Sequence, residues 1–537
     1  MKRTIYTAIL LAASMGMASC QDWLTEQAPA KTDIKDFFTS TEAAEQTVNA
    51  AYVPLQWEYS NDFFPEWFIG DICSDDAIKG GENLTDEATL YDMCNFKTTS
   101  NNQTLLDYYR SQWQGIARAN LAIEQVGAME TGTDENFTES MKNRLIGEAK
   151  FLRAYYYFRL VRVFGGVPRI EKPIYSSNDW KQPRATAESI YELILSDLAD
   201  AEADLWIKED YDDEDLGRAT KGAAMAMLMK VNLYLGEYDT ARQWGEKLIY
   251  DNEGGYYDLC PNYMDNFYVE GDNGIESVFE IQYYKEGTSD WGGDLPNGGH
   301  GASRGTFTPT MTRPRSSHIC GAGNTGYGFN KPSIDLYNEF EEGDPRREYT
   351  IVTQDKVDTP EQEIHYGNRF ISRKYLCENK AGGFETIDNA MRCPLNRKEI
   401  RYADVLLMYA EACIESNTDL GRAKEAINRV RARVGLGEVE ATRENLRHER
   451  RVELGMEGHR WFDLCRWGIV GDTMRAYKKK YSGEIEYSGL VDEDGIGYAT
   501  KTNEGNDMFD FVDGKHELFP IPWEETSLGG LEQNPGY

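Results

Sequence analysis

Residues 455–467, GMEGHRWFDLCRW, bring together a histidine, an aspartate and a cysteine, which are residue types of nucleophilic catalytic sites. If the stretch is helical, Cys465 is rotated by about 240 degrees around the axis from His459, so the two side chains point about 120 degrees apart and form a poor nucleophile pair. His459 and Asp463 share one face, whereas an apolar stripe that includes Trp461 and Cys465 occupies another. The pattern therefore predicts a helix end packed in a core, with its Arg, Asp and His side chains satisfied among themselves.

Other catalytic and cofactor motifs are weak. GAGNTG at 321–326 fits the dinucleotide fingerprint, but no strand precedes it and no helix follows it. The six histidines are scattered without an HExxH motif, and VDEDGIG at 491–497 lacks the twelve-residue frame of a calcium loop. Because the 91 acidic residues offer many chance carboxylate pairs, they give no specific sign of glycoside hydrolysis. The sequence predicts a protein that is not an enzyme and holds no cofactor or metal.

Helical periodicity predicts helices over about 38–250 and again over about 398–470. These helices must position any functional site. Apolar residues recur at helical spacing between 187 and 205, with acidic residues on the other side. In MAMLMKVNLYLGEYDTARQWGEKLI, Gly236 falls where a tetratricopeptide hairpin has its turn between helices. The same pattern recurs in DVLLMYAEACIESNTDLGRAKEAINRV.

Two further helix pairs complete the expected stack. A helix that ends at Gly165 pairs with 187–205, and segment 105–127 pairs with a helix at 41–57. Such hairpins cannot bury their apolar faces alone, so several must stack. The predicted fold class is mainly α: a single large domain of four tetratricopeptide-like helical hairpins with a long irregular insertion of loops and short strands.

The insertion spans about 251–397 and is rich in Gly, Pro, Asn and Tyr, with short β-like runs such as ESVFEIQYY. It is too long for a simple connection, and segments of this kind on a rigid scaffold commonly carry function. A C-terminal excursion follows at 471–537 and includes an acidic, Gly-rich stretch from about 480 to 510.

The N-terminus predicts export. MKRTIYTAILLAASMGMASC has a basic start, an apolar run and small residues before Cys20, as in a secretory signal. MASC resembles the lipobox of bacterial lipoproteins, which implies that Cys20 is lipidated; an ordinary signal peptide is the alternative. The expected division is a signal peptide at 1–19, the lipidated cysteine and a tether at 20–37, and one domain at 38–537.

Charge narrows the class of partner. The chain has 57 basic and 91 acidic residues, a net charge of -34, so it repels phosphate backbones and nucleic acid is excluded as a partner. Aromatic residues make up 12% of the chain, and many fall in polar, Gly-rich stretches where a core does not need them. Exposed aromatic side chains in such stretches favour a binding function.

Four segments carry a family resemblance: FLRAYYYFRLVRVFGGVP, IRYADVLLMYAEA, ERRVELGMEGHRWFDLCRW and LFPIPWEETSLGGLEQNPGY. Together with the lipobox they resemble the SusD/RagB family of Bacteroidetes outer-membrane lipoproteins, over essentially the whole chain. The resemblance implies a lipid anchor in the outer membrane, facing the exterior, and a partner SusC-like TonB-dependent transporter. It also implies capture of oligosaccharide for that transporter.

Oligosaccharides present flat apolar CH faces and hydroxyl groups, so their sites need aromatic platforms beside planar hydrogen-bonding groups. By the resemblance, the family's ligand sites draw on loops near 61–97 and 283–330. The expected platforms are Trp291 and Tyr284, followed by Trp67 and Tyr327. The expected polar partners are Asp76, Asn83, Asp290 and Arg313.

The sequence leaves three alternatives open. In the first, the protein captures a peptide rather than a glycan, as some members of the family do. A non-enzymatic protein-interaction scaffold is the second alternative, because stacked helical hairpins often bind only proteins. A surface hydrolase is the third, and no catalytic constellation supports it.

Overall fold

The computed structural model describes the following parts of the chain: residues 38–58, 65–132, 134–176, 179–285, 305–313, 326–353, 368, 370–385, 393–482 and 508–537. The expected signal peptide, the lipidated Cys20 and the tether lie outside the described residues, as do Asp290 and Trp291.

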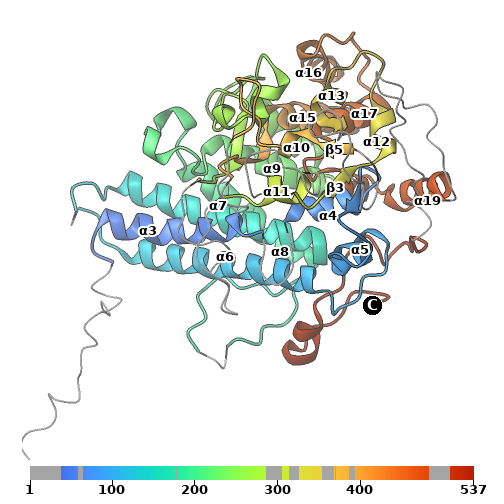
Figure 1. Ribbon diagram of the computed structural model, residues 1–537. Coiled ribbons are helices and arrows are strands. Elements are labelled where there is room, and N and C mark those ends of the chain that lie inside the picture. The colour runs from blue at the N-terminus through green and yellow to red at the C-terminus, as the bar shows by residue number, and fades with distance from the viewer. Residues whose placement is uncertain are drawn as a thin grey trace, which may run out of the picture.

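Long helices form the scaffold (Figure 1). They are α3 (Thr41–Tyr52), α6 (Gln103–Ala128), α7 (Glu139–Phe164), α8 (Ala187–Asp204), α9 (Lys221–Leu235), α10 (Tyr238–Ile249), α15 (Tyr402–Glu415), α16 (Leu420–Arg433), α17 (Arg443–Leu454) and α19 (Val470–Tyr481). They pack as the pairs α3–α6, α7–α8, α9–α10 and α15–α16, and adjacent pairs touch through α6–α7, α8–α9 and α10–α15. This arrangement confirms the predicted fold class of four stacked hairpins.

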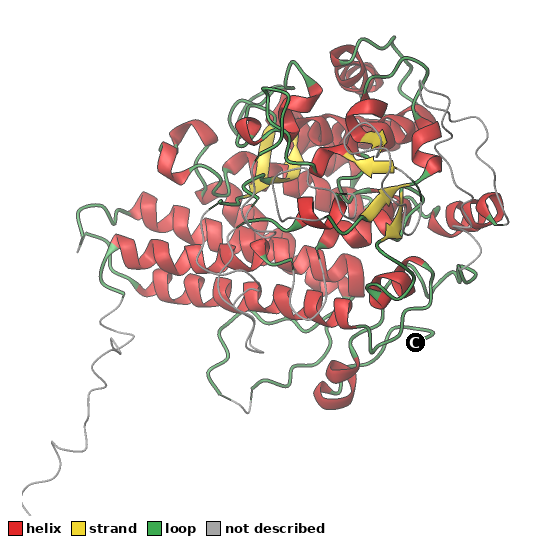
Figure 2. Cartoon of the chain, in the orientation of Figure 1, coloured by secondary structure: helices red, strands yellow, loops and turns green. Residues whose placement is uncertain are grey.

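Shorter elements cover one side of this stack (Figure 2). The short helices are α4 (Glu66–Ile72), α5 (Ala88–Cys94), α11 (Thr308–Thr312), α12 (Ile334–Glu339), α13 (Arg346–Thr350) and α18 (Arg460–Arg466). The strands form three antiparallel pairs: β1 (Ala77–Gly80) with β3 (Phe329–Pro332), β2 (Ser277–Ile281) with β6 (Arg397–Arg401), and β4 (Ile351–Thr353) with β5 (Phe370–Ser372). Strand β2 lies within the β-like run ESVFEIQYY.

Local sequence explains where the scaffold helices begin and end. The side chains of Asn102, Thr138, Thr186 and Thr220 each accept a hydrogen bond from a backbone N–H in the first turn of the next helix. Helix α9 ends at Gly236, whose φ of 73° is left-handed, and its N–H donates back to the last turn. The hairpin turn expected at this glycine is therefore confirmed.

Two predicted boundaries differ from the structure. The first helix ends at Tyr52 instead of continuing to residue 57, because Pro54 lacks the N–H that an α-helix needs there, and a 3-10 turn η1 (Val53–Gln56) follows. The C-terminal excursion expected from 471 onward begins with a helix, α19, whose buried Val470, Met474 and Tyr477 repeat at helical spacing.

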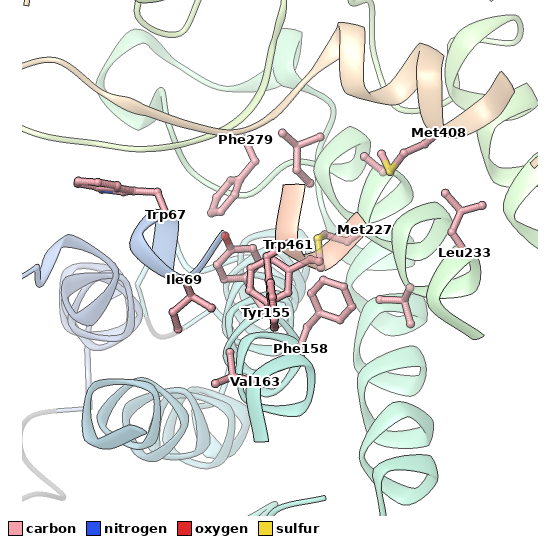
Figure 3. Packing of buried hydrophobic residues seen from close by; sticks show 14 of the residues in the cluster. Trp67, Ile69, Tyr155, Phe158, Val163, Met227, Leu233, Phe279, Met408 and Trp461 are labelled. Carbon is pink, nitrogen blue, oxygen red and sulfur yellow. The ribbon is translucent and has the colours of Figure 1, made fainter. Parts of the chain in front are cut away.

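The core lies where α7 crosses the molecule. Figure 3 shows side chains from α4, α7, α9, β2, α15 and α18 meeting in one cluster that includes Ile69, Tyr155, Phe279 and Trp461. Phe279 stands edge-on to Tyr155, with ring centroids 5.5 Å apart. Although α7 is buried along most of its length, none of the described helices is both long and apolar enough to cross a membrane.

Candidate ligand-binding face

The stretch that carries His459 and Cys465 is part of the packed scaffold. Asp463 accepts hydrogen bonds from Arg450 (3.0 Å) and Arg466 (2.8 Å), and these two guanidinium groups hold its pKa at about 2 against the opposing effect of burial. Burial lowers the pKa of His459 to about 4 and raises that of Cys465 well above its usual range, so both are neutral near pH 7. The structure agrees with a packing role for this stretch.

One detail of that expectation is wrong. The charged residues of the stretch were expected to satisfy one another, but Arg460 reaches out of it and forms a bidentate ion pair with Asp75, at 2.8 and 2.9 Å. The stretch therefore ties the C-terminal part of the scaffold to the loop after α4. Within the described residues, no group of three or more His, Cys, Asp and Glu side chains is placed to hold a metal ion.

Described segments of the two regions expected to form the ligand site lie side by side. Strand β1 pairs with β3, so Ala77 lies opposite Pro332 and Gly80 opposite Phe329. The Gly81 N–H donates to the Gly328 carbonyl at 2.8 Å and extends this pairing by one step. Regions 61–97 and 283–330 thus meet along a short antiparallel ribbon, although they are far apart in the sequence.

A buried carboxylate, Glu58, lies just before region 61–97 and bonds to residues of region 283–330. Glu58 accepts hydrogen bonds from the Phe307 N–H at 2.6 Å, the Thr308 hydroxyl at 2.8 Å and the Thr306 hydroxyl at 3.0 Å. Burial raises the pKa of Glu58, while these donors oppose the shift. Glu58 was not among the predicted residues, and no local pattern around it distinguishes it from the other acidic residues of the chain.

Trp67 is a core residue in this structure and not an exposed platform. Its side chain is fully buried, its ring stacks on Tyr375 at 5.8 Å, and its Nε1 donates to the Thr308 hydroxyl at 3.1 Å. A ring with no accessible face cannot stack on a sugar, which corrects the expectation for this residue. Its role is to fasten α4 to α11.

Asp76 is also committed to the scaffold. It is buried and accepts a hydrogen bond from Arg451 Nε at 2.7 Å, while the other side of the same guanidinium contacts Asp75 at 3.0 Å. Burial raises the pKa of Asp75, but the charges of Arg451 and Arg460 outweigh it and hold that pKa well below its usual range. This pairing corrects the expectation that Asp76 faces a ligand.

Three other residues expected at the ligand site make contacts within the protein. Arg313 is fully buried and donates to the Thr310 hydroxyl at 3.1 Å. Tyr327 is half-buried and its ring stands edge-on to Phe307, with centroids 5.6 Å apart. Asn83 is exposed, but its side-chain oxygen accepts from the Thr85 and Asp86 N–H groups and so stabilises its own turn.

Tyr284 meets the expectation of an exposed aromatic ring. Its side chain is 54% exposed and lines a cavity of about 350 Å³, together with Tyr52, Gln56, Arg218 and Gln282. This cavity lies between the end of α3, the loop before α9 and the end of β2. An exposed tyrosine beside amide and guanidinium groups has the composition of a sugar-binding surface.

The backbone just before Tyr284 is held by an amide network. The Tyr283 N–H donates to Asn396 Oδ1 at 2.7 Å, and Gln56 Nε2 donates to the Gln282 carbonyl at 2.6 Å. The Gln282 side chain exchanges two hydrogen bonds with Asn273, at 2.8 and 3.0 Å. Because these contacts fix Gln282 and Tyr283, between the end of β2 and Tyr284, the backbone that carries Tyr284 is preorganised. Gln56 and Gln282 were not predicted, because single amides carry no recognisable pattern.

We call the surface formed by Tyr284, Gln56 and Gln282 the candidate face. The fold and this face define a class of protein: a scaffold of stacked helical hairpins with an insertion of loops and short strands that presents aromatic and amide groups. Residues 22–233 match a family model described as SusD-like, "Starch-binding associating with outer membrane", and residues 395–537 match the SusD family model. The chain belongs to the SusD/RagB family.

Individual relatives agree with this assignment. The chain is 27% identical to a SusD-like protein of Bacteroides ovatus, over 91% of this chain and 87% of that protein. It is 26% identical to the SusD-like protein P38 of Formosa agariphila, over 88% of this chain and 93% of that protein.

Solved structures are similar over nearly the whole fold. A laminarin-binding SusD-like protein superposes with a TM-score of 0.76 at 28% identity, covering 92% of this chain and 99% of that one. A second similar structure is surface glycan-binding protein A of Bacteroides thetaiotaomicron in complex with laminarihexaose. It superposes with a TM-score of 0.74 at 25% identity, covering 92% of this chain and 100% of that one.

Proposed function

We propose that this protein is a cell-surface glycan-binding lipoprotein that captures oligosaccharide and delivers it to a partner SusC-like TonB-dependent transporter. Two similar structures, at 28% and 25% identity, are described as binding laminarin or laminarihexaose, and one matching family model is described as starch-binding. The observation that carries the proposal in this chain is the exposed Tyr284 on a fixed backbone beside the cavity of about 350 Å³.

The chemistry of this face suits a sugar ring. The exposed face of Tyr284 offers a flat apolar surface for the CH groups of a pyranose. Gln56 borders the same cavity, and while its amide nitrogen donates to the Gln282 carbonyl, its amide oxygen can accept from a hydroxyl group. A ring over Tyr284 with a hydroxyl toward this amide uses both kinds of group at once. We include Trp291, Asp290 and Tyr327 in the proposed site as sequence predictions.

The proposed localisation of the protein follows from its N-terminal sequence. A signal peptide at 1–19 and acylation of Cys20 place the protein on the outer membrane, and residues 20–37 act as a tether. Residues 38–537 then form one binding domain that faces the exterior, with the candidate site in its 251–397 insertion and in the loops packed against it.

Calorimetric titration against a panel of host and plant polysaccharides tests glycan capture, with wild-type protein, Trp291→Ala and Trp523→Ala. Trp523 is a suitable control because its side chain is 52% exposed and lies outside the proposed site. We expect binding to one class of glycan, a loss of about tenfold or more in Trp291→Ala, and no change in Trp523→Ala. If the folded wild-type protein binds no glycan, glycan capture is wrong and peptide capture takes its place.

Delivery to the transporter has its own test. We expect the protein to co-purify from outer membranes with a TonB-dependent barrel, and the complex to survive detergent extraction. Recovery of the protein alone from membranes that contain the barrel contradicts the delivery half of the proposal and leaves glycan capture standing.

A further inference from the structure

A larger cavity lies on a different part of the molecule. It measures about 680 Å³ and is bounded by α6, by residues within 168–175 and 180–182, and by C-terminal residues within 525–531. None of these residues belongs to regions 61–97 or 283–330. The volume lies in the range of about 300–1,000 Å³ that is typical of small-ligand sites.

Aromatic rings from two elements border this cavity. Trp180 and Tyr175 are 52% and 69% exposed, and Trp113 of α6 is half-buried at the wall. Trp113 is held edge-on to Tyr109 and Tyr157, with ring centroids 5.8 Å away in both cases. Leaving large rings in contact with water is unfavourable, so their gathering around a single concavity points to a ligand that covers them.

Tyr175 is held in place although it is exposed. Its hydroxyl donates to Glu124 Oε1 at 2.5 Å and accepts from Gln125 Nε2 at 3.3 Å, so α6 anchors the phenol end of the ring. The Lys181 ammonium lies 5.0 Å from the centre of the Trp180 ring. Glu124 and Gln125 therefore hold the Tyr175 ring in place, which lowers the entropic cost of binding on it.

Polar side chains also line the same space. Among the described residues, the side chains of Gln114, Lys172 and Glu525 make no hydrogen bond or ion pair, and all three border the cavity. Between them they supply an amide, an ammonium donor and a carboxylate acceptor. Hydroxyl groups donate and accept, so a sugar with several of them can satisfy all three, which an aliphatic ligand cannot do.

We propose that this cavity is a second glycan-binding site, which takes a short oligosaccharide on Trp180 and Tyr175 and hydrogen-bonds it through Gln114, Lys172 and Glu525. The proposal goes beyond capture at the Tyr284 face and does not depend on it. Two sites on one anchored protein let one polysaccharide chain bind twice, which strengthens retention at the cell surface through effective concentration.

Titration of the purified protein with defined hexasaccharides tests this site. The probes are laminarihexaose, maltohexaose, cellohexaose and xylohexaose, each measured with wild type, Trp180→Ala and Trp523→Ala. The control removes an equally exposed tryptophan that does not line the cavity. We expect at least one probe whose affinity falls about tenfold in Trp180→Ala, or whose stoichiometry falls from two to one, with no change in Trp523→Ala.

A second variant guards against local unfolding of the loop that carries Trp180. Gln114→Ala alters the opposite wall, on α6, and we expect a loss of about threefold to tenfold for the same probe. Tyr284→Ala is expected to leave this component of binding intact, which separates the second site from the proposed capture site.

Two results overturn the proposal. The first is equal affinity and stoichiometry of wild type and Trp180→Ala for every probe, including absence of binding to both. The second is reduced co-purification of Trp180→Ala with the transporter at unchanged glycan affinity, because the cavity is then a protein interface.

Discussion

Polar groups are arranged in opposite ways in two parts of this molecule. Around Arg401, in the interior, the guanidinium group donates at 2.7–2.8 Å to Glu276, Glu453 and Glu457 and is enclosed by them. At the candidate face, Tyr284 and the neighbouring amides border open space. In this fold a dense group of charged residues therefore marks the scaffold, whereas exposed rings beside uncharged amides mark the surface available to a ligand.

The largest expected effect comes from breaking the enclosed cluster. Arg401→Met leaves three buried carboxylates without their shared partner, so we expect a loss of about 3–5 kcal/mol in the free energy of unfolding. Arg443→Met is the matched control, because Arg443 forms a bidentate pair with Glu415 but its side chain is 63% exposed. That variant should lose less than about 1 kcal/mol. Denaturant titration measures both variants. Equal losses in their free energy of unfolding contradict the expected difference between the buried and the exposed ion pair.

Acid should weaken the scaffold in a defined pH range. Arg450 and Arg466 hold the pKa of Asp463 at about 2, and Arg401 and Lys374 hold that of Glu457 at about 2, against the opposing effect of burial. A lowered pKa in the folded state stabilises the fold above the unfolded value, near pH 4, and this contribution disappears as pH falls through about 2. We expect the free energy of unfolding to decline from about pH 5 to pH 2, by roughly 2 kcal/mol from Asp463 alone.

The pH effect can be assigned by mutation. In Asp463→Asn the acid-dependent decline should be smaller, because the group that titrates is gone, while stability at pH 7 is lower. An unchanged pH profile in that variant contradicts the assignment.

A smaller effect tests the close packing of α6 on α7. A Cβ added at Gly115 lies 2.2 Å from the Tyr156 ring, so Gly115→Ala should cost about 1–3 kcal/mol through overpacking. Gly127, on the same helix, has open space around it. Gly127→Ala should stabilise the protein by about 0.5–1 kcal/mol through helix propensity. Thermal unfolding of both variants measures the difference, and a neutral Gly115→Ala is the contrary result.

The scaffold is predictable from sequence because its signals are local. Helical periodicity within a few turns predicts the hairpins, and a glycine at 236 predicts the turn between α9 and α10. The resemblance to known proteins adds that regions 61–97 and 283–330 lie together, which periodicity alone does not reveal.

The expected site residues depend on contacts that are distant in sequence, and local sequence is a poor guide to them. Trp67 is buried by Thr308 and Tyr375, and Asp76 is paired with Arg451 across 375 residues of chain. An aromatic or acidic residue in a Gly-rich stretch looks exposed until such a partner is known. Tyr284 is exposed as expected, and Trp291 stays a prediction.

Titration of one binding oligosaccharide against Tyr284→Ala and Tyr256→Ala measures whether Tyr284 is part of a ligand site. The two tyrosines are 54% and 56% exposed, but Tyr256 lies outside the candidate cavity. We expect Tyr284→Ala to weaken the binding at the candidate face about tenfold and Tyr256→Ala to leave it unchanged. Equal affinities of both variants and wild type would contradict a ligand site at Tyr284.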